Sequence, residues 1–290
     1  MFKALIKSMR PRQWAKNVFL LAAIVFDRQL TNPTAMARTM AGLIIFCLLS
    51  STVYLLNDIA DIEADRNHPL KRLRPIASGA LPLNAAIFAS ILLMAISLPA
   101  AYLLSPSFAI IAIIYFLLNL AYSKYLKHVP LIDVMVLAAF YVIRVVAGVS
   151  LIQVERFSPW LYVVTTLLAL YIGFGKRRGE ILLLQEVNMD STRKVLEGYS
   201  LSFLDQLITI VSGTTIVSYS LYTFSAPNLP ENHTMMLTIP FVVYGIFRYL
   251  YLIQIKGEGG APDELFLTDK PLQATIFFFG VAVLIIFYIF

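Results

Sequence analysis

The chain has 290 residues, of which 59% are apolar and only 14% are charged, with a formal net charge of +6. Its mean hydropathy of +0.77 excludes a soluble globular protein, because about a quarter of the residues in soluble domains are charged. The single cysteine, Cys47, excludes a disulfide framework and a cysteine-based metal site.

The first 16 residues are basic and mildly amphipathic. They are not followed by a signal-peptide cleavage site and a polar mature region. We therefore expect residues 1–16 to be an interfacial segment of the mature protein rather than a signal peptide. Apolar stretches recur from there to the C-terminus, which leaves no room for a sizeable soluble domain. We predict a single membrane domain over residues 1–290.

These apolar stretches predict an all-α polytopic membrane protein, since about 20 mostly apolar residues are needed to span a bilayer. The first stretch is interrupted by Asp27 and Arg28, and the fourth and sixth are short. The sequence predicts nine transmembrane helices, near residues 17–35, 38–57, 83–104, 107–124, 131–152, 159–175, 203–224, 235–255 and 272–289.

The basic residues lie mostly on one side of this topology. On that side fall 18 of the 23 Lys and Arg residues. They occupy positions 3–16, 66–74, 124–127, 176–178, 193–194, 256 and 270. Since basic loops mark the cytoplasmic side, we expect a multi-pass protein of the cell membrane with its N-terminus inside, although that rule alone puts basic loops in any membrane protein.

The loop after the second predicted span reads NDIADIEADRNHPLKRLRPIASG, residues 57–79. Asn57, Asp61 and Asp65 are four residues apart, so on a helix they share one face, with Asp58 on the adjoining flank. Carboxylates this close repel one another unless a cation lies between them, and Mg²⁺ prefers oxygen ligands. The spacing predicts a Mg²⁺ site formed by these four residues, with Mn²⁺ as a substitute. The alternative is a solvated helix end whose charges pair with the following basic residues.

Cationic loops follow the acidic motif. Lys71, Arg72 and Arg74 come directly after it, and guanidinium groups bind phosphate oxygens well. Tyr122 and Lys124 lie at the next cytoplasmic turn, and GKRRGE, residues 175–180, lies at a further one. A metal with cationic loops indicates a polyphosphate ligand.

Arg144 lies well inside its span, beyond Asp133 near the cytoplasmic end. A buried membrane charge usually serves function, and an Arg144–Asp133 pair that only fixes helix packing is the alternative.

NDIADIEAD resembles the first aspartate-rich motif of the UbiA superfamily of intramembrane prenyltransferases, and the likeness covers essentially the whole chain. It implies a bundle of nine helices around a central cavity, open to the lipid for an isoprenoid chain. Where many members carry a second aspartate motif, this sequence has YIGFGKRRGE. With RPRQWAKN, HPLKRLRPIASG and APDELFLTDKPL, this departure resembles a branch of polyprenyl-phosphate phosphoribosyltransferases.

The resemblance implies transfer of 5-phosphoribose from phosphoribosyl pyrophosphate to a decaprenyl-type phosphate, for a lipid-linked arabinose precursor of the cell wall. Asp58, Asp61 and Asp65 would be catalytic through the metal. The candidate substrate-binding residues are Lys16, Asn57, Lys71, Arg72, Arg74, Tyr122, Lys124, Arg144, Tyr171, Lys176, Arg177 and Arg178. Asp263, Glu264 and Asp269 are expected in a solvated loop, with a lid as the second interpretation.

Two rival functions remain open. One is an aromatic prenyltransferase of the same superfamily, which would use a prenyl diphosphate donor in a quinone or haem pathway. The other is a lipid-phosphate carrier, although a carrier needs a site reached from both faces. The expected partners are the bilayer, the polyprenyl phosphate and phosphoribosyl pyrophosphate, with no nucleic acid, and the sequence leaves the oligomeric state open.

Overall fold

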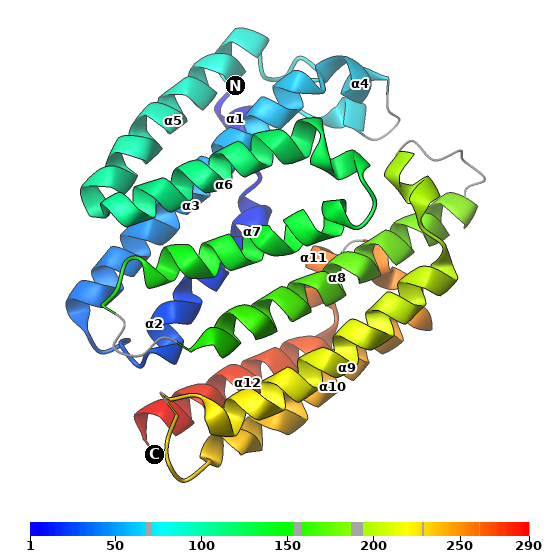
Figure 1. The fold of residues 1–290 in the computed structure, drawn as a ribbon. Helices are drawn as coiled ribbons and strands as arrows, with labels where there is room; N and C mark the ends of the chain where they lie inside the picture. The colour runs from blue at the N-terminus through cyan, green and yellow to red at the C-terminus, as the bar shows by residue number, and fades with distance from the viewer. Residues whose placement is uncertain (68–70, 154–157, 187–193, 228, 261, 290) are drawn as a thin grey trace. The chain divides into compact units, whose positions relative to one another are not determined.

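The computed structural model describes residues 1–67, 71–153, 158–186, 194–227, 229–260 and 262–289, and the side chains of Glu186, Lys194 and residues 262–264 also lie outside the description. Every secondary-structure element in the described residues is a helix (Figure 1). The chain divides into two units, one of residues 1–124 with 143–153, and the other of residues 125–142 with 154–290. Each unit is described by itself, and the single domain expected over residues 1–290 stays a prediction.

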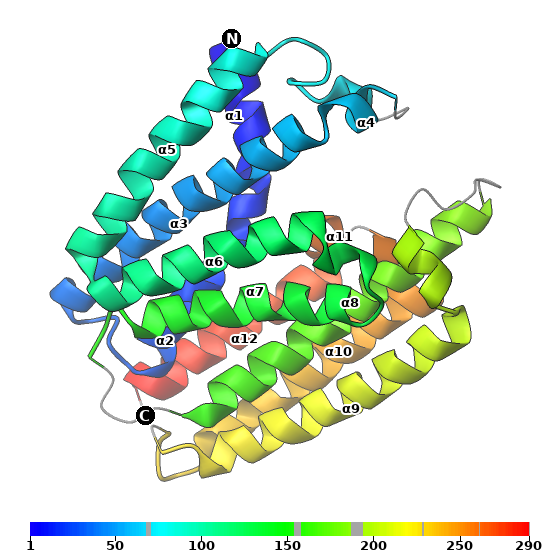
Figure 2. The same ribbon diagram turned by 45° about the horizontal axis from the view of Figure 1, so that its top comes forward.

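The first unit contains the acidic motif. Its elements are α1 (Phe2–Met9), η1 (Pro11–Leu21), α2 (Ala22–Phe26), α3 (Pro33–Ala60), α4 (Ile62–Arg66), η2 (Lys71–Leu73), α5 (Leu83–Leu104), α6 (Pro106–Lys124) and the second part of α7 (Ile132–Val149), where η denotes a 3₁₀ helix. The long helices α3 and α5 run side by side in this unit (Figures 1 and 2).

The second unit contains the KRR segment. Its elements are η3 (Leu126–His128), the first part of α7, α8 (Pro159–Glu186), η4 (Lys194–Gly198), α9 (Leu201–Ser225), η5 (Thr234–Thr238), α10 (Ile239–Gln254), η6 (Glu258–Gly260), α11 (Pro262–Thr268) and α12 (Lys270–Tyr288). Helix α9 packs against α8 and α10, and α12 packs against α10.

The all-helical membrane architecture predicted from the composition is confirmed. Seven stretches of the described chain are long and apolar enough to cross a membrane. Large apolar side chains such as Leu103, Ile110 and Phe277 are exposed on these helices, as a lipid environment allows. Helix α8 has 28 residues but carries the charged GKRRGE segment within its length. The count of nine spans stays a prediction.

The first predicted span has a different local structure from the expected continuous helix. Residues 11–21 form the 3₁₀ helix η1, and a short α2 follows. Arg28 then adopts a left-handed conformation with φ of 57°, and α3 begins at Pro33. A residue in this conformation cannot continue a right-handed helix, so the chain turns where Asp27 and Arg28 interrupt the apolar pattern.

Two close backbone approaches require glycine. In the first unit, a Cβ atom on Gly148 would lie 2.0 Å from the carbonyl oxygen of Leu20, so only glycine lets η1 contact α7 there. In the second unit, a Cβ atom on Gly179 would lie 2.1 Å from the backbone nitrogen of Gly260. Small residues commonly permit such contacts between membrane helices. Gly179 therefore fixes the GKRRGE segment against η6.

Candidate active site

The acidic motif lies across the junction of α3 and α4. Asn57 and Asp58 are in the last turn of α3, Asp61 follows the end of that helix, and Asp65 is in α4. The N–H of Asp61 donates to the carbonyl of Asn57 at 2.9 Å, and the N–H of Asp65 donates to that of Asp61 at 2.8 Å. The helical four-residue spacing therefore persists through the junction, although the two helices are separate elements.

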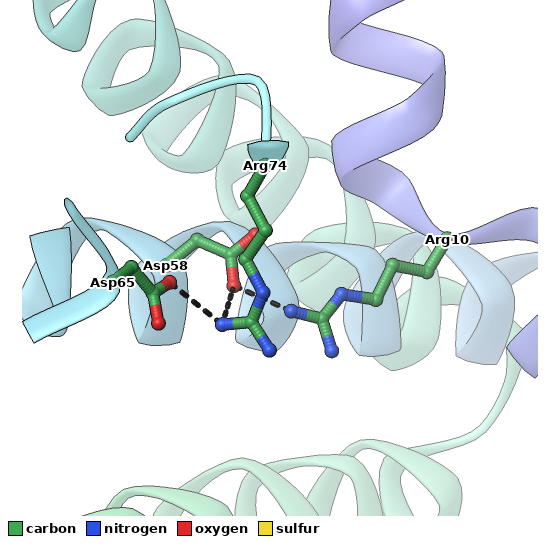
Figure 3. Close-up of polar contacts among 4 residues, drawn as sticks. All are labelled: Arg10, Asp58, Asp65 and Arg74. Atoms are coloured by element: carbon green, nitrogen blue, oxygen red, sulfur yellow. Dashed lines mark hydrogen bonds and ion pairs between the residues drawn. The ribbon is translucent and has the colours of Figure 1, made fainter. Parts of the chain in front are cut away.

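Asp58 and Asp65 form the buried part of this motif. Their side chains are 2% and 3% exposed, and both contact the guanidinium group of Arg74 (Figure 3). Nη1 of Arg74 lies 2.7 Å from Oδ2 of Asp65 and 3.2 Å from Oδ1 of Asp58. Two carboxylates thus converge on a single cationic position. Asp61 and Asn57 are half-buried beside them.

Arg74 is held in this position by a tightly turned loop. The N–H of Arg74 donates to the carbonyl of Lys71, and the N–H of Ser78 donates to the carbonyl of Arg74, each at 2.9 Å. Ile76 and Leu81 anchor the loop because their buried side chains pack with Leu55 at the end of α3. Ile76 and Leu81 therefore fix the loop that carries Arg74 against α3.

Arg10 is a second cation at the same carboxylates. Its Nη2 donates to Oδ1 of Asp58 at 2.5 Å (Figure 3). Its guanidinium carbon lies 4.9 Å from the centre of the Tyr54 ring. Arg10 links α1 to η1 and has a left-handed backbone, with φ of 54° and ψ of 61°. This conformation is uncommon for a residue other than glycine and is typically held by the surrounding structure. The turn directs the Arg10 side chain towards α3.

The described residues include no group of three or more His, Cys, Asp or Glu side chains arranged to hold a metal ion. The pair Asp58 and Asp65 nevertheless converges on one cation, with oxygen atoms that suit a hard divalent ion. Mg²⁺ is commonly held by one or two protein carboxylates together with substrate phosphates and water. The donor set therefore fits a divalent cation that shares its ligands with a phosphate-bearing substrate.

The other predicted residues of the first unit lie at several depths. Lys71 and Arg72 are exposed on η2, and Lys124 is exposed at the end of α6, where Tyr122 is half-buried. Lys16 is half-buried on η1. The side chains of Lys71, Arg72 and Lys124 are therefore accessible to anionic ligands.

Arg144 is buried among neutral hydrogen-bonding groups. Its Nε donates to Oδ1 of Asn17 at 2.8 Å, and its Nη2 donates to the hydroxyl of Tyr115 at 3.1 Å. Asn17 in turn donates to Ser50 and contacts the sulfur of Cys47. Arg144 thus connects η1 to α3, α6 and α7 within the first unit.

Asp133, the alternative partner considered for Arg144, instead binds Arg177. Nε of Arg177 lies 2.6 Å from Oδ2 of Asp133, and its Nη1 lies 2.6 Å from Oε2 of Glu180. The hydroxyl of Tyr199 donates to Oδ1 of Asp133 at 2.6 Å. Burial and this hydrogen bond raise the pKa of the Tyr199 phenol above its usual range, so it remains a donor at neutral pH. Arg177, 1% exposed, is therefore part of a buried network of the second unit.

The other predicted site residues of α8 have different surroundings. Nε of Arg178 lies 2.7 Å from Oδ1 of Asp205, and its Nη1 donates to the carbonyl of Ile253 at 2.6 Å. Lys176 is half-buried on α8. Tyr171 packs edge-on against Tyr249 and donates its hydroxyl to the carbonyl of Ile246 at 2.8 Å, so it belongs to the core of this unit.

The PDELFLTDK segment is helical rather than an open loop, since α11 covers Pro262–Thr268. The side chains of Asp263 and Glu264 lie outside the described residues. Asp269 caps α12 by accepting from the N–H of Leu272, and it forms a two-contact ion pair with Arg248 at 3.1 and 2.7 Å. The hydrogen bond from Arg248 holds the pKa of Asp269 below its usual range. Asp269 therefore has the geometry of a helix cap.

From the sequence, Arg10 is identified only as one of the basic residues of the cytoplasmic face. No periodic pattern predicts a left-handed turn at that position, and the only local signal is the proline that follows it in RPRQW. The sequence also gives no sign of the ion pair between Asp133 and Arg177, because these residues are 44 positions apart. The predicted convergence of the basic loops on one face stays a prediction.

Comparisons with known proteins give a consistent result. The sequence profile of the UbiA prenyltransferase family matches residues 18–268. The chain is 35% identical over 284 residues to a decaprenyl-phosphate phosphoribosyltransferase of Corynebacterium glutamicum, covering 93% of this chain and 82% of that one. It is 34% identical to the protein of the same name from Mycolicibacterium smegmatis, covering 93% and 87%.

Solved structures share the fold at lower identity. A UbiA homologue from Archaeoglobus fulgidus, solved bound to DMAPP and Mg²⁺, has a TM-score of 0.73 at 17% identity, with 99% of both chains covered. A UbiA homologue from Aeropyrum pernix has a TM-score of 0.66 at 17% identity, with 93% of this chain and 96% of that chain covered.

Proposed function

Because this chain belongs to the UbiA prenyltransferase family, we propose that it transfers 5-phosphoribose from phosphoribosyl pyrophosphate to a polyprenyl phosphate of the decaprenyl type. Pyrophosphate is the second product. The names of the curated relatives, which span most of this chain, support this choice of donor and acceptor. The product would serve as a lipid-linked precursor of cell-wall arabinan.

One observation carries the proposal. Asp58 and Asp65 converge on the guanidinium group of Arg74, and Arg10 is a second cation at Asp58. A divalent cation, Mg²⁺ in this proposal, would be held by these two carboxylates, with Asn57 and Asp61 beside them. When bound, it would neutralise charge on the departing pyrophosphate.

The side chains of the chain provide the remaining chemistry. Arg74, with Lys71 and Arg72 in the same loop, would bind and orient the diphosphate of the donor. A phosphate oxygen of the acceptor attacks C1 of the ribose, the C1–O bond to pyrophosphate breaks, and the bonding electron pair leaves with pyrophosphate. The acceptor phosphate has a second pKa of about 6, so it is already ionised and needs no protein base. Attack opposite the leaving group inverts C1 from α to β.

The basic loops support a location in the cell membrane, with the reaction at the cytoplasmic face. Both charged substrates would then meet the acidic motif at the membrane boundary, while the polyprenyl chain stays in the lipid. Lys16, Lys124 and Lys176 are the remaining candidate contacts for the acceptor phosphate. The YIGFGKRRGE segment lacks the aspartates of a second metal site, which favours phosphoribosyl transfer over aromatic prenyl transfer.

Radiolabelled donor tests the proposal. Purified protein in detergent with Mg²⁺ and ribose-labelled phosphoribosyl pyrophosphate should produce lipid-extractable label only when a polyprenyl phosphate is added. A parallel reaction with a labelled prenyl diphosphate and an aromatic acceptor tests prenyl transfer. Label incorporated only in that second reaction would reject phosphoribosyl transfer and favour an aromatic prenyltransferase.

A further inference from the structure

Two arginines contact the carboxylates that would hold the cation. Asp58 contacts Arg10 at 2.5 Å and Arg74 at 3.2 Å, and Asp65 contacts Arg74 at 2.7 Å. The carboxylates are almost fully buried, whereas the side chains of Arg10 and Arg74 are 30% and 29% exposed. The carboxylates are thus paired from within, and the arginines still reach solvent.

Both arginines keep hydrogen-bond donors for another anion. A guanidinium group has five N–H donors, and the bonds to the carboxylates use only Nη2 of Arg10 and Nη1 of Arg74. Each group therefore has donors on its partly exposed side, where a phosphate group would approach.

The backbone at Arg10 supports a specific role for this residue. Its left-handed turn places the guanidinium over the ring of Tyr54 and against Asp58, although α1 and η1 come from a distant part of the sequence. Such a conformation is unfavourable for a residue other than glycine and persists where surrounding contacts enforce it. The ion pair with Asp58 and the Tyr54 contact supply that enforcement.

We propose that Arg10 and Arg74 are exchangeable counter-ions of Asp58 and Asp65, which move to phosphate oxygens when a divalent cation takes the carboxylates. Arg10 then couples binding of the cation to binding of the diphosphate. The proposal rests on the proposed function for the presence of a divalent cation and a diphosphate, but not for the identity of the sugar or of the acceptor.

The exchange makes the two ligands depend on each other. A cation that arrives alone must break the ion pairs and leave two guanidinium groups without their counter-charges. A diphosphate that arrives with it provides new acceptors for both arginines. The cation therefore binds weakly alone and tightly with diphosphate, and by linkage it raises the affinity for diphosphate by the same factor.

Binding of Mn²⁺ measures this coupling without catalysis. Free Mn²⁺ is quantified by its electron paramagnetic resonance signal, in titrations of the full-length protein in detergent, with and without inorganic pyrophosphate. The Mn²⁺–pyrophosphate complex formed without protein is subtracted. The test variant is Arg10→Gln and the control is Arg12→Gln. The control removes a positive charge from an exposed side chain two positions further along the chain.

Arg10→Gln should bind Mn²⁺ about fivefold tighter than the wild type in the absence of pyrophosphate, because one competing ion pair is gone. Pyrophosphate should then tighten Mn²⁺ binding less in this variant than in the wild type or in Arg12→Gln. Arg74→Gln should give the same pattern, and it replaces Arg10→Gln if thermal melting shows that variant to be unfolded.

Equal Mn²⁺ affinities for Arg10→Gln and Arg12→Gln under both conditions would overturn the exchange, as would weaker binding to Arg10→Gln without pyrophosphate. The transfer assay separates the two proposals. Wild-type protein that transfers phosphoribose but lacks the Arg10-dependent coupling rejects the exchange alone. Coupling without transfer to polyprenyl phosphate supports the exchange and rejects the proposed donor and acceptor.

Discussion

Side chains of the acidic motif differ in what holds them. Asp58 and Asp65 are buried against arginines, whereas Asp61 is half-buried at the end of α3. Glu63, in the same motif, is exposed and pairs at 2.8 Å with Arg66. Substitutions at these four acidic positions therefore have different consequences for stability, and Asp61 offers the cleanest test of a role in catalysis.

We expect Asp61→Asn to lower transfer activity by at least about 100-fold, because a metal ion contributes several kcal/mol to stabilising the charge of the transition state. The melting temperature should stay close to that of the wild type, since the side chain is not in the buried ion-pair cluster. Glu63→Gln, which removes the same charge nearby, should keep its activity. Equal activities of the two variants would show that Asp61 has no special role.

Arg177 was expected among the phosphate contacts, but the buried network with Asp133 gives it a structural role to test. Arg177→Gln would leave Asp133 buried without its cation, which costs about 3–5 kcal/mol. We expect a clearly lower melting temperature, partly restored by adding Asp133→Asn. Lys176→Gln, on the preceding position of α8, should fold normally and weaken substrate binding instead.

An Arg177→Gln protein with the wild-type melting temperature and reduced donor affinity would contradict this structural role. It would indicate that Arg177 leaves Asp133 to contact the substrate. Melting in detergent and donor binding, measured on the same preparations, distinguish these outcomes.

Individual helices end and begin at chemically marked residues. Helix α3 is capped at its N-terminus by Asn32, whose side chain accepts from the N–H groups of Thr34 and Ala35. Helix α12 is capped by Asp269, which also binds Arg248 on α10. A cap that also pairs with a neighbouring helix fixes the packing of two elements at once.

The Asp269–Arg248 pair predicts a pH-dependent stability. The folded state holds the pKa of Asp269 below its unfolded value of about 3.9, so the pair contributes stability above that pH and loses it as pH falls through the lower folded pKa. Asp269→Asn keeps a good helix cap but removes the charge. We expect Asp269→Asn to melt at a lower temperature than the wild type. The difference between the two melting temperatures should be nearly constant from pH 8 to about pH 5.

The difference between the two melting temperatures should narrow below about pH 4, where the Asp269 carboxylate of the wild type becomes protonated and loses its charge. Melting curves of both proteins over this pH range give the measurement. A difference that stays constant down to the lowest pH would assign the loss to altered packing rather than to charge.

For the whole molecule, the distribution of basic residues predicts which loops face the cytoplasm. The acidic motif and the exposed Lys71 are expected inside, and the loop between α9 and η5, which contains Glu231, outside. Because the chain has one cysteine, Cys47, a Cys47→Ser background allows single cysteines to be placed at will.

A membrane-impermeant maleimide should label Glu231→Cys in intact spheroplasts and Lys71→Cys only after lysis. Each variant serves as the control for the other, since both side chains are exposed. Labelling of Lys71→Cys before lysis would reverse the predicted orientation and place the acidic motif outside the cell.

Features that depend on local pattern can be predicted from the sequence. Apolar length gave most helices within a few residues, as for the expected span at 83–104, which matches α5 (Leu83–Leu104). Four-residue spacing identified the acidic motif, and the basic run after it contained Arg74. These features follow from helical periodicity and from the dimensions of a bilayer, which act on neighbouring residues.

The partners of the charged side chains depend instead on how distant parts of the chain pack together, and the three-dimensional structure was needed to identify them. It brought Arg10 to Asp58 across 48 positions and Arg177 to Asp133 across 44, and it separated buried Asp58 from half-buried Asp61. A buried charge is stable only beside an opposite charge or several hydrogen bonds, and packing of distant helices selects which group fills that position. For that reason the sequence predicted the kinds of residues at this site, and the fold determined their pairing.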